Sequence, residues 1–266
     1  MPLQTKRQSQ LRSLVNLARY PIDDHPEGSL QTLVKHYKPQ LQREGFCCLR
    51  NFLLSTATKT LVSEIAQVEA LAYYGLTSAT PYFNDFDSAL PNDHPRNIKT
   101  PRELGLLAAD QIPDASQLFK LYKSKELLQF LTALLDKEML YPVADCYQKL
   151  SIAVIPEGAG HNWHFDDADF TITLMLRKPA NGGKFECVPK LRSPTNENYD
   201  GVRTILQGQR DHVKVNIYDM AGRLVSTLVN ETLNRSYKLN NGAGLFFDLI
   251  LKFFLRRVII FYLLFL

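Results

Sequence analysis

The sequence predicts an α+β protein whose N-terminal half is helical and whose C-terminal half is built from short strands. Before residue 140, apolar residues recur at helical spacing in several segments. After Tyr141 and Pro142 the apolar segments are short, β-prone and separated by turn residues. The 266 residues can bury one substantial core, and a content of 45% hydrophobic and 22% charged residues is ordinary for a globular protein.

The N-terminal half begins with an expected irregular arm, residues 1–28, which is polar and contains two prolines. Periodic apolar residues then predict helices, the first ended by Gly45 and followed by a short strand at residues 46–49. Residues 72–114 show little periodicity and are rich in Pro, Asn and Asp, which predicts a long loop of the kind that is usually functional. The predicted helices are Ser29–Glu44, Ser55–Leu71, Ser116–Tyr122 and Lys125–Leu135.

The C-terminal half contains five β-prone segments bounded by turn residues, and no internal repeat. The layout is therefore a helical half wrapped on a β-core. The predicted strands are Tyr147–Ile155, Phe170–Leu176, Lys184–Val188, Val202–Leu206 and Val213–Tyr218.

Residues 241–266 form an aberrant hydrophobic tail, almost wholly Leu, Phe and Ile from Leu245 onward. Its length permits a membrane span. Its four charged residues, however, cost about 2–3 kcal/mol each near the middle of a bilayer. Core strands are expected even less, because the tail has neither a period of two nor caps. An altered reading frame or a truncated gene end is the favoured hypothesis. It is tested by reading the nucleotide sequence in all frames, and the absence of a family-like continuation would refute it.

Charge and cysteine content exclude some classes of partner. The net charge is +4, and no Lys/Arg cluster lies on a recognisable nucleic-acid motif, so no nucleic-acid partner is expected. The four cysteines lack the paired spacing of a zinc site or a disulfide framework, which indicates reduced thiols. The N-terminus has no apolar segment typical of a signal peptide, and a cytoplasmic location is expected.

The most informative motif is His161-Asn-Trp-His164-Phe-Asp166-Asp167. On a β-strand, residues two apart point to the same face, so the imidazole of His164 and the carboxylate of Asp166 converge. They supply two of the three ligands of a two-His, one-carboxylate facial triad, the geometry that holds non-haem Fe(II). An H-x-D pair alone is weak evidence. Here it precedes an alternating strand and a Gly182-Gly183 turn, which strengthens the prediction.

This succession resembles the Fe(II)/2-oxoglutarate-dependent oxygenases, and more closely the group that hydroxylates or halogenates free amino acids such as lysine. The resemblance covers about residues 20–210 and includes the segments 90–96, 110–116 and 192–199. It implies a double-stranded β-helix (jelly-roll) core within residues 29–240. It also implies Fe(II) and 2-oxoglutarate as cofactors, with molecular oxygen and an amino-acid-like small molecule as substrates. Halogenating members carry a small residue in place of the aspartate, so Asp166 favours hydroxylation.

The same resemblance implies substrate contacts from His161 and Asp167, and it places Arg96 and Asp145 near the site. An arginine is a natural clamp for a substrate carboxylate. The alternatives are an exposed loop histidine and a turn carboxylate for the first two residues, and a surface salt bridge for Arg96.

The family pattern breaks at the third ligand. Similar proteins carry a Ser-Leu-His-Arg segment there, followed by an arginine that grips 2-oxoglutarate. Here Thr232-Leu-Asn234-Arg235 falls at that place, so Asn234 would replace the histidine, with a weaker neutral oxygen donor. His212, the only histidine after the pair, is an alternative ligand. Residues 213–231 also resemble the β-hairpin of bacterial secretion-sorting and flagellar-hook-cap immunoglobulin-like domains.

Three functional hypotheses follow. The first is an active amino-acid hydroxylase of this oxygenase type. The second is an inactive relative that has lost its third ligand. The third is a membrane-tethered or secreted fragment, suggested by the tail.

Overall fold

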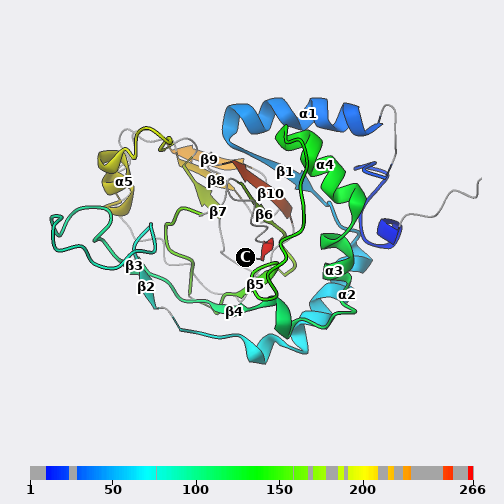
Figure 1. The fold of residues 1–266 in the computed structure, drawn as a ribbon, viewed down its shortest axis with the longest axis horizontal. Helices are drawn as coiled ribbons and strands as arrows, with labels where there is room; N and C mark the ends of the chain where they lie inside the picture. Colours follow the sequence, from blue (N-terminus) through cyan, green and yellow to red (C-terminus); the bar gives the residue numbers. More distant parts are fainter. Residues whose placement is uncertain are drawn as a thin grey trace, which may run out of the picture.

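The computed structural model places its long helices beside a mixed six-stranded sheet, with a second, smaller sheet further along the chain (Figure 1). It describes residues 10–23, 29–75, 77–157, 159–166, 170–177, 185–188, 191–208, 215–218, 224–228, 248–253 and 263–265. Helices α1 and α4 lie side by side, and α1 packs against strands β1 and β10 (Figure 1).

The predicted helices are confirmed, with one shortened. Helix α1 spans Ser29–Glu44 and is followed by Gly45, whose positive φ of 76° is typical of a helix C-terminus. Helix α2 ends at Ala66 rather than at Leu71, and the short 3-10 turn η2 (Glu69–Leu71) follows. Helices α3 and α4 are capped by the side chains of Ser116 and Ser124. The other three predicted helices are α2 (Ser55–Ala66), α3 (Gln117–Tyr122) and α4 (Lys125–Leu135).

The N-terminal arm is irregular as predicted, apart from the 3-10 turn η1 (Gln10–Ser13), but it is not separate from the core. The hydroxyl of Tyr20 donates a 2.6 Å hydrogen bond to the carbonyl of Arg50, the last residue of strand β1 (Phe46–Arg50). The apolar residues of the arm are too few and too unevenly spaced to show a helical or strand period. They are nevertheless buried in the core. The buried residues of this segment are Leu11, Leu14, Val15, Tyr20 and Ile22.

The six-stranded sheet has the order β1-β10-β6-β11-β5-β4. Strand β10 is antiparallel to both β1 and β6, whereas β11 is parallel to both β6 and β5. Strand β6 is buried at all four positions. The strands are β1 (Phe46–Arg50), β4 (Gly105–Leu107), β5 (Ser151–Val154), β6 (Phe170–Thr173), β10 (Asp248–Phe253) and β11 (Leu263–Phe265).

Strands β10 and β11 come from the hydrophobic tail, so the low expectation of core strands there was wrong. The physical reason is pairing with strands that lie far away along the chain, which the local pattern does not record. No helix in the described part of the chain is long and apolar enough to cross a membrane.

The smaller sheet is the antiparallel set β7 (Phe185–Cys187), β8 (Val215–Tyr218) and β9 (Leu224–Leu228). Strands β8 and β9 form the hairpin that was predicted within residues 213–231, with Val215 opposite Leu228. The long loop is irregular apart from β4, the 3-10 turn η3 (Ala109–Gln111) and a two-stranded ladder of β2 (Ser78–Ala79) with β3 (Thr100–Pro101).

The predicted strand at Val202–Leu206 was wrong, because this segment belongs to helix α5 (Tyr199–Leu206). Asn198 caps the helix, since its side-chain oxygen accepts a 3.2 Å hydrogen bond from the peptide N–H of Gly201. Val202 and Ile205, three residues apart, are the buried face. A cap and an i, i+3 pair outweigh the β propensity of a short segment. The jelly-roll topology and the domain boundaries remain predictions.

Candidate metal centre

His164 and Asp166 converge on one point, although they do not lie on a strand. Residues 159–166, here called the histidine loop, are irregular. The Nε2 atom of His164 lies 3.2 Å from Oδ1 of Asp166, and their side chains are only 14% and 5% exposed. Two neighbouring ligands of an octahedral metal with bonds of about 2.1 Å lie about 3.0 Å apart. The pair therefore has the spacing of two adjacent metal ligands.

The tautomer of His164 is fixed by the backbone. Its Nδ1 lies 2.7 Å from the carbonyl oxygen of Asn162. A carbonyl only accepts, so Nδ1 carries a proton. Nε2 faces Oδ1 of Asp166, and in the neutral imidazole it presents its lone pair there. Metal-binding histidines commonly donate their second ring N–H to a backbone carbonyl in this way. The donor set thus fits a divalent cation such as Fe(II), with one neutral imidazole and one carboxylate.

Strand β2 and the residues that follow β2 and β3 hold the histidine loop in place. The buried side chain of Asn162 donates a 3.2 Å hydrogen bond to the carbonyl of Ala79. The peptide N–H of Phe165 donates to the carbonyl of Pro81 at 2.8 Å. Glu103, just after β3, donates its peptide N–H to the carbonyl of Gly160 at 3.0 Å. The β2–β3 ladder therefore positions both predicted ligands.

His161 lies against the predicted ligand pair. Its ring stacks on that of His164 with a centroid distance of 4.0 Å and an interplanar angle of 21°. On a regular strand a residue three positions earlier would point to the opposite face. The irregular backbone of the histidine loop brings it to the same side, as a substrate contact requires.

Two residues that the sequence analysis did not single out lie on the same side. The ring of Phe83 is 5.7 Å from that of His164, and the Arg102 guanidinium carbon is 5.9 Å from the centre of the Phe83 ring. Phe83 has a positive φ of 53°, which is rare for a bulky residue and is often found at functional sites. The only sequence signal for either residue was its place in the long loop.

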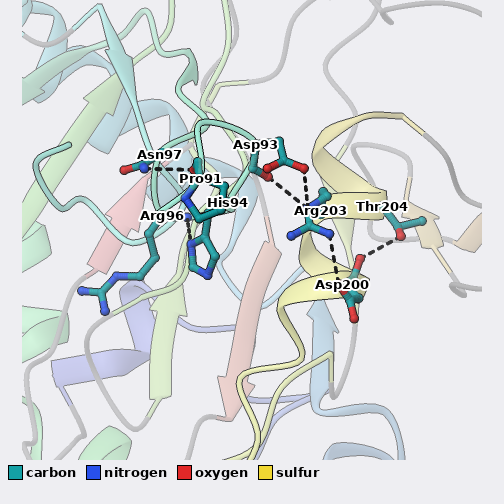
Figure 2. Close-up of polar contacts among 8 residues, drawn as sticks. All are labelled: Pro91, Asp93, His94, Arg96, Asn97, Asp200, Arg203 and Thr204. Atoms are coloured by element: carbon teal, nitrogen blue, oxygen red, sulfur yellow. Dashed lines mark hydrogen bonds and ion pairs between the residues drawn. The ribbon is translucent and has the colours of Figure 1, made fainter. Parts of the chain in front are cut away.

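Arg96 is connected to the histidine loop indirectly, by way of the aromatic rings of Tyr82 and Phe165. Its guanidinium carbon is 6.0 Å from the centre of the Tyr82 ring, and Tyr82 is 5.0 Å from Phe165. Its peptide N–H donates to Nδ1 of His94, and its exposed side chain points away from the Asp93–Arg203 contact (Figure 2). Burial is the main cause that raises the pKa of Tyr82, to about 12.

The loop that carries Arg96 is tied to helix α5. The Nε atom of Arg203 donates a 3.0 Å hydrogen bond to the carbonyl of Asp93, and its guanidinium also contacts Asp200 within α5 (Figure 2). Tyr199, at the start of α5, packs its ring 4.4 Å from that of His94. Loop, helix and histidine loop therefore form one contiguous region.

Asp145 caps a turn. Its carboxylate accepts hydrogen bonds from the peptide N–H groups of Tyr147 and Gln148, which lower its pKa. No hydrogen bond or ion pair in the described residues joins it to His164 or Asp166. Its predicted contact with substrate remains a prediction.

The remaining predicted residues, Asp167, His212 and Asn234, lie outside the described residues. Within the part of the chain that the structure describes, no third His, Cys, Asp or Glu side chain completes a metal-binding group with His164 and Asp166. The predicted third ligand therefore stays untested.

Comparison with protein families gives one match. A model of the family Halogenase D matches residues 84–243, more than half of the chain. The chain belongs to the Halogenase D family. The Halogenase D match includes the histidine loop, Arg96 and helix α5, and it continues past residue 210, where the sequence analysis places the departure from the family. No curated protein matches the chain.

Proposed function

We propose that the protein is an Fe(II)/2-oxoglutarate-dependent oxygenase that hydroxylates an unactivated C–H bond of a free amino acid or a similar small molecule. The observation that carries this proposal is the convergence of His164 Nε2 and Asp166 Oδ1 at 3.2 Å. Membership of the Halogenase D family supports it. When bound, Fe(II) and 2-oxoglutarate supply the oxidising power, since 2-oxoglutarate and oxygen are converted to succinate, carbon dioxide and one transferable oxygen atom.

The chain's own residues hold the metal and set the outcome. Nδ1 of His164 donates to the carbonyl of Asn162, so Nε2 of the neutral imidazole is the nitrogen that offers a lone pair to the metal. Asp166 offers a negative oxygen to the same point. A carboxylate at this position occupies the place that a halide would need, so it favours hydroxylation over halogenation.

His161 and Asp167 are the proposed substrate contacts beside the metal. His161 fits this role because its ring covers one face of the His164 imidazole. A protonated or neutral imidazole there donates or accepts a hydrogen bond at the substrate. Asp167 follows Asp166 directly and would offer a negative charge to an ammonium group.

We propose Asn234 as the third ligand and His212 as the alternative. Asn234 falls within the segment that matches Halogenase D, as does His212. An amide oxygen binds Fe(II) more weakly than an imidazole does, so a low iron affinity is expected. A protein that binds no iron would be an inactive relative. This second candidate is favoured by the sequence, which has Asn234 where similar proteins have the third ligand.

The jelly-roll core remains part of the proposal. The antiparallel set β1-β10-β6 and the antiparallel set β7-β8-β9 are suited to face each other as the two sheets of such a fold. The parallel pairing of β11 with β5 and β6 is a departure from an all-antiparallel jelly roll.

The deciding experiment is an anaerobic titration of the full-length protein with Fe(II) and 2-oxoglutarate. A visible metal-to-ligand charge-transfer band that saturates is expected, and it should be lost in Asp166→Ala. The matched control is Asp145→Ala, an exposed turn carboxylate that should leave the band unchanged. Absence of a band in the wild-type protein would refute an assembled centre and favour the inactive relative.

A further inference from the structure

Arg102 is a buried cation that pairs with no anion among the described residues. The residue is only 8% exposed, and its Nε atom is fully enclosed with no hydrogen-bond partner. Among the described residues, no carboxylate or carbonyl accepts a hydrogen bond from its guanidinium, which lies over the ring of Phe83. A buried, unpaired charge is strongly disfavoured, so its persistence calls for a ligand that pairs with it.

The place of Arg102 in the fold puts it near the predicted metal ligands. It follows β3 directly, and its peptide N–H donates to the carbonyl of Thr77 at 2.9 Å, just before β2. Phe83 links it to the centre, since one aromatic ring contacts both the Arg102 guanidinium and the His164 imidazole. Phe83 itself has a left-handed backbone, with a φ of 53°.

Two more buried polar atoms in this region have no partner among the described residues. They are Oγ1 of Thr100, in β3, and Oδ1 of Asn162, in the histidine loop that is bonded to β2. The orientation of the Asn162 amide is set by the carbonyl of Ala79, which can only accept. Buried polar atoms are nearly always satisfied, so several unsatisfied ones in one structural unit indicate a polar ligand.

We propose that Arg102 is the docking group of a carboxylate-binding subsite beside His164 and Asp166. The ligand class follows from the guanidinium, whose planar fork matches the two oxygens of a carboxylate. Two sources share this chemistry: the co-substrate 2-oxoglutarate and the carboxylate of an amino-acid substrate. This proposal rests on the proposed function in one respect, the role of His164 and Asp166 as metal ligands. The carboxylate subsite at Arg102 does not depend on that role.

Arg102, and not Arg96, has the properties of such a docking group. Arg96 is exposed and packs over Tyr82, so water already solvates its charge. A carboxylate held there would compete with solvent and gain little. Desolvation at Arg102 lowers the pKa of the guanidinium, yet the group stays charged because an arginine side chain does not lose its proton in proteins.

The test measures carboxylate binding without metal and without turnover. Full-length, metal-free protein is titrated in one arm with 2-oxoglutarate and in the other with each of the twenty standard amino acids, and affinity is read by calorimetry. At least one of these carboxylates should bind, and Arg102→Met should weaken that binding at least tenfold. Arg43→Met, an exposed arginine at the end of α1, is the matched control and should stay within twofold. The arm that responds to Arg102→Met identifies the source of the carboxylate.

A second readout separates a ligand-binding arginine from a structural one. If Arg102 lacks a partner in the free protein, Arg102→Met removes an unpaired buried charge, and its melting temperature should equal or exceed that of the wild type. A lower melting temperature would indicate a structural arginine and overturn the proposal. So would the absence of binding by any of these carboxylates, or unchanged binding in Arg102→Met. Because no iron is present, none of these outcomes depends on whether the metal centre assembles.

Discussion

The Nδ1 proton of His164 is held by the carbonyl of Asn162, and the side chain of that same asparagine is bonded to Ala79 in β2. One residue thus fixes the tautomer of the predicted ligand and anchors its loop to the ladder. The geometry of the site depends on this connection, because the histidine loop has no regular hydrogen bonding of its own.

Removal of either predicted ligand should abolish iron binding. His164→Ala and Asp166→Ala are each expected to lower Fe(II) affinity at least about 100-fold, since loss of a group one step further from a metal already costs about 10–100-fold. Affinity is measured by anaerobic competition with a coloured chelator. His36→Ala is the control, because His36 packs its ring edge-on against Tyr37 in α1. Wild-type affinity in both variants would rule out this site.

Asn162→Ala should weaken iron binding without removing a ligand. The backbone carbonyl remains, but the side-chain bond to Ala79 is lost, so the loop is less well positioned. We expect a fall in Fe(II) affinity of about tenfold and a loss of about 1 kcal/mol in the free energy of unfolding. Asn196→Ala, in an exposed turn, provides the comparison. Equal iron affinity in the two variants would contradict the positioning role.

Asn234→His should raise iron affinity if this segment supplies the third ligand. An imidazole binds Fe(II) more strongly than a neutral amide oxygen does, and a gain of about tenfold or more is expected. Asn240→His controls for a nonspecific gain from an added histidine. If neither variant gains affinity, or both gain equally, Asn234 is not the ligand, and His212→Ala becomes the next variant to measure.

The buried thiol of Cys47 should make the fold sensitive to alkaline pH. Burial raises the pKa of Cys47 to about 12, from an ordinary value of 9.0. Between these values the unfolded chain releases a proton that the folded chain keeps, so stability is complete below pH 9 and falls as the pH rises toward 12. From pH 8 to pH 10 the loss is about 1.4 kcal/mol.

This loss is measured by urea unfolding at the two pH values. Cys47→Ala should lack the part that the thiol contributes, whereas the exposed Cys146→Ala should behave as the wild type. The half-buried Tyr82 and the buried Tyr122, whose pKa values are also raised to about 12, contribute equally in all three proteins. An identical pH dependence in Cys47→Ala and wild type would show that the thiol is not protected.

The sequence predicted helices well where one apolar face repeats over several turns, as Leu30, Leu33 and Leu41 do in α1. It failed at α5, where an asparagine cap decides the structure of eight residues, and at β10, which pairs with two strands far away along the chain. In both cases the deciding interaction is made with residues outside the segment.

In the candidate metal centre, too, the local sequence predicted some residues and not others. His164 and Asp166 were predicted because their types and spacing carry the chemistry locally. Phe83 and Arg102 were not, because an arginine becomes informative only when it is buried without a partner, and a phenylalanine only when its backbone is left-handed. Both properties arise from the folded chain. His161 shows an intermediate case, since its role depended on whether its segment is a strand or a loop.

Strand β10 lies between β1 and β6 and pairs with both. During synthesis, β1 and β6 leave the ribosome long before β10 does, so each waits with an unpaired edge exposed. Until the hydrophobic tail emerges, the nascent chain carries two sites open to pairing with other chains. The six-stranded sheet can therefore be completed only after the tail has been synthesised. Loss of β10 would leave both of these edges exposed permanently. Chains shortened before β10 should depend on chaperones or aggregate, even though every residue of the histidine loop is present.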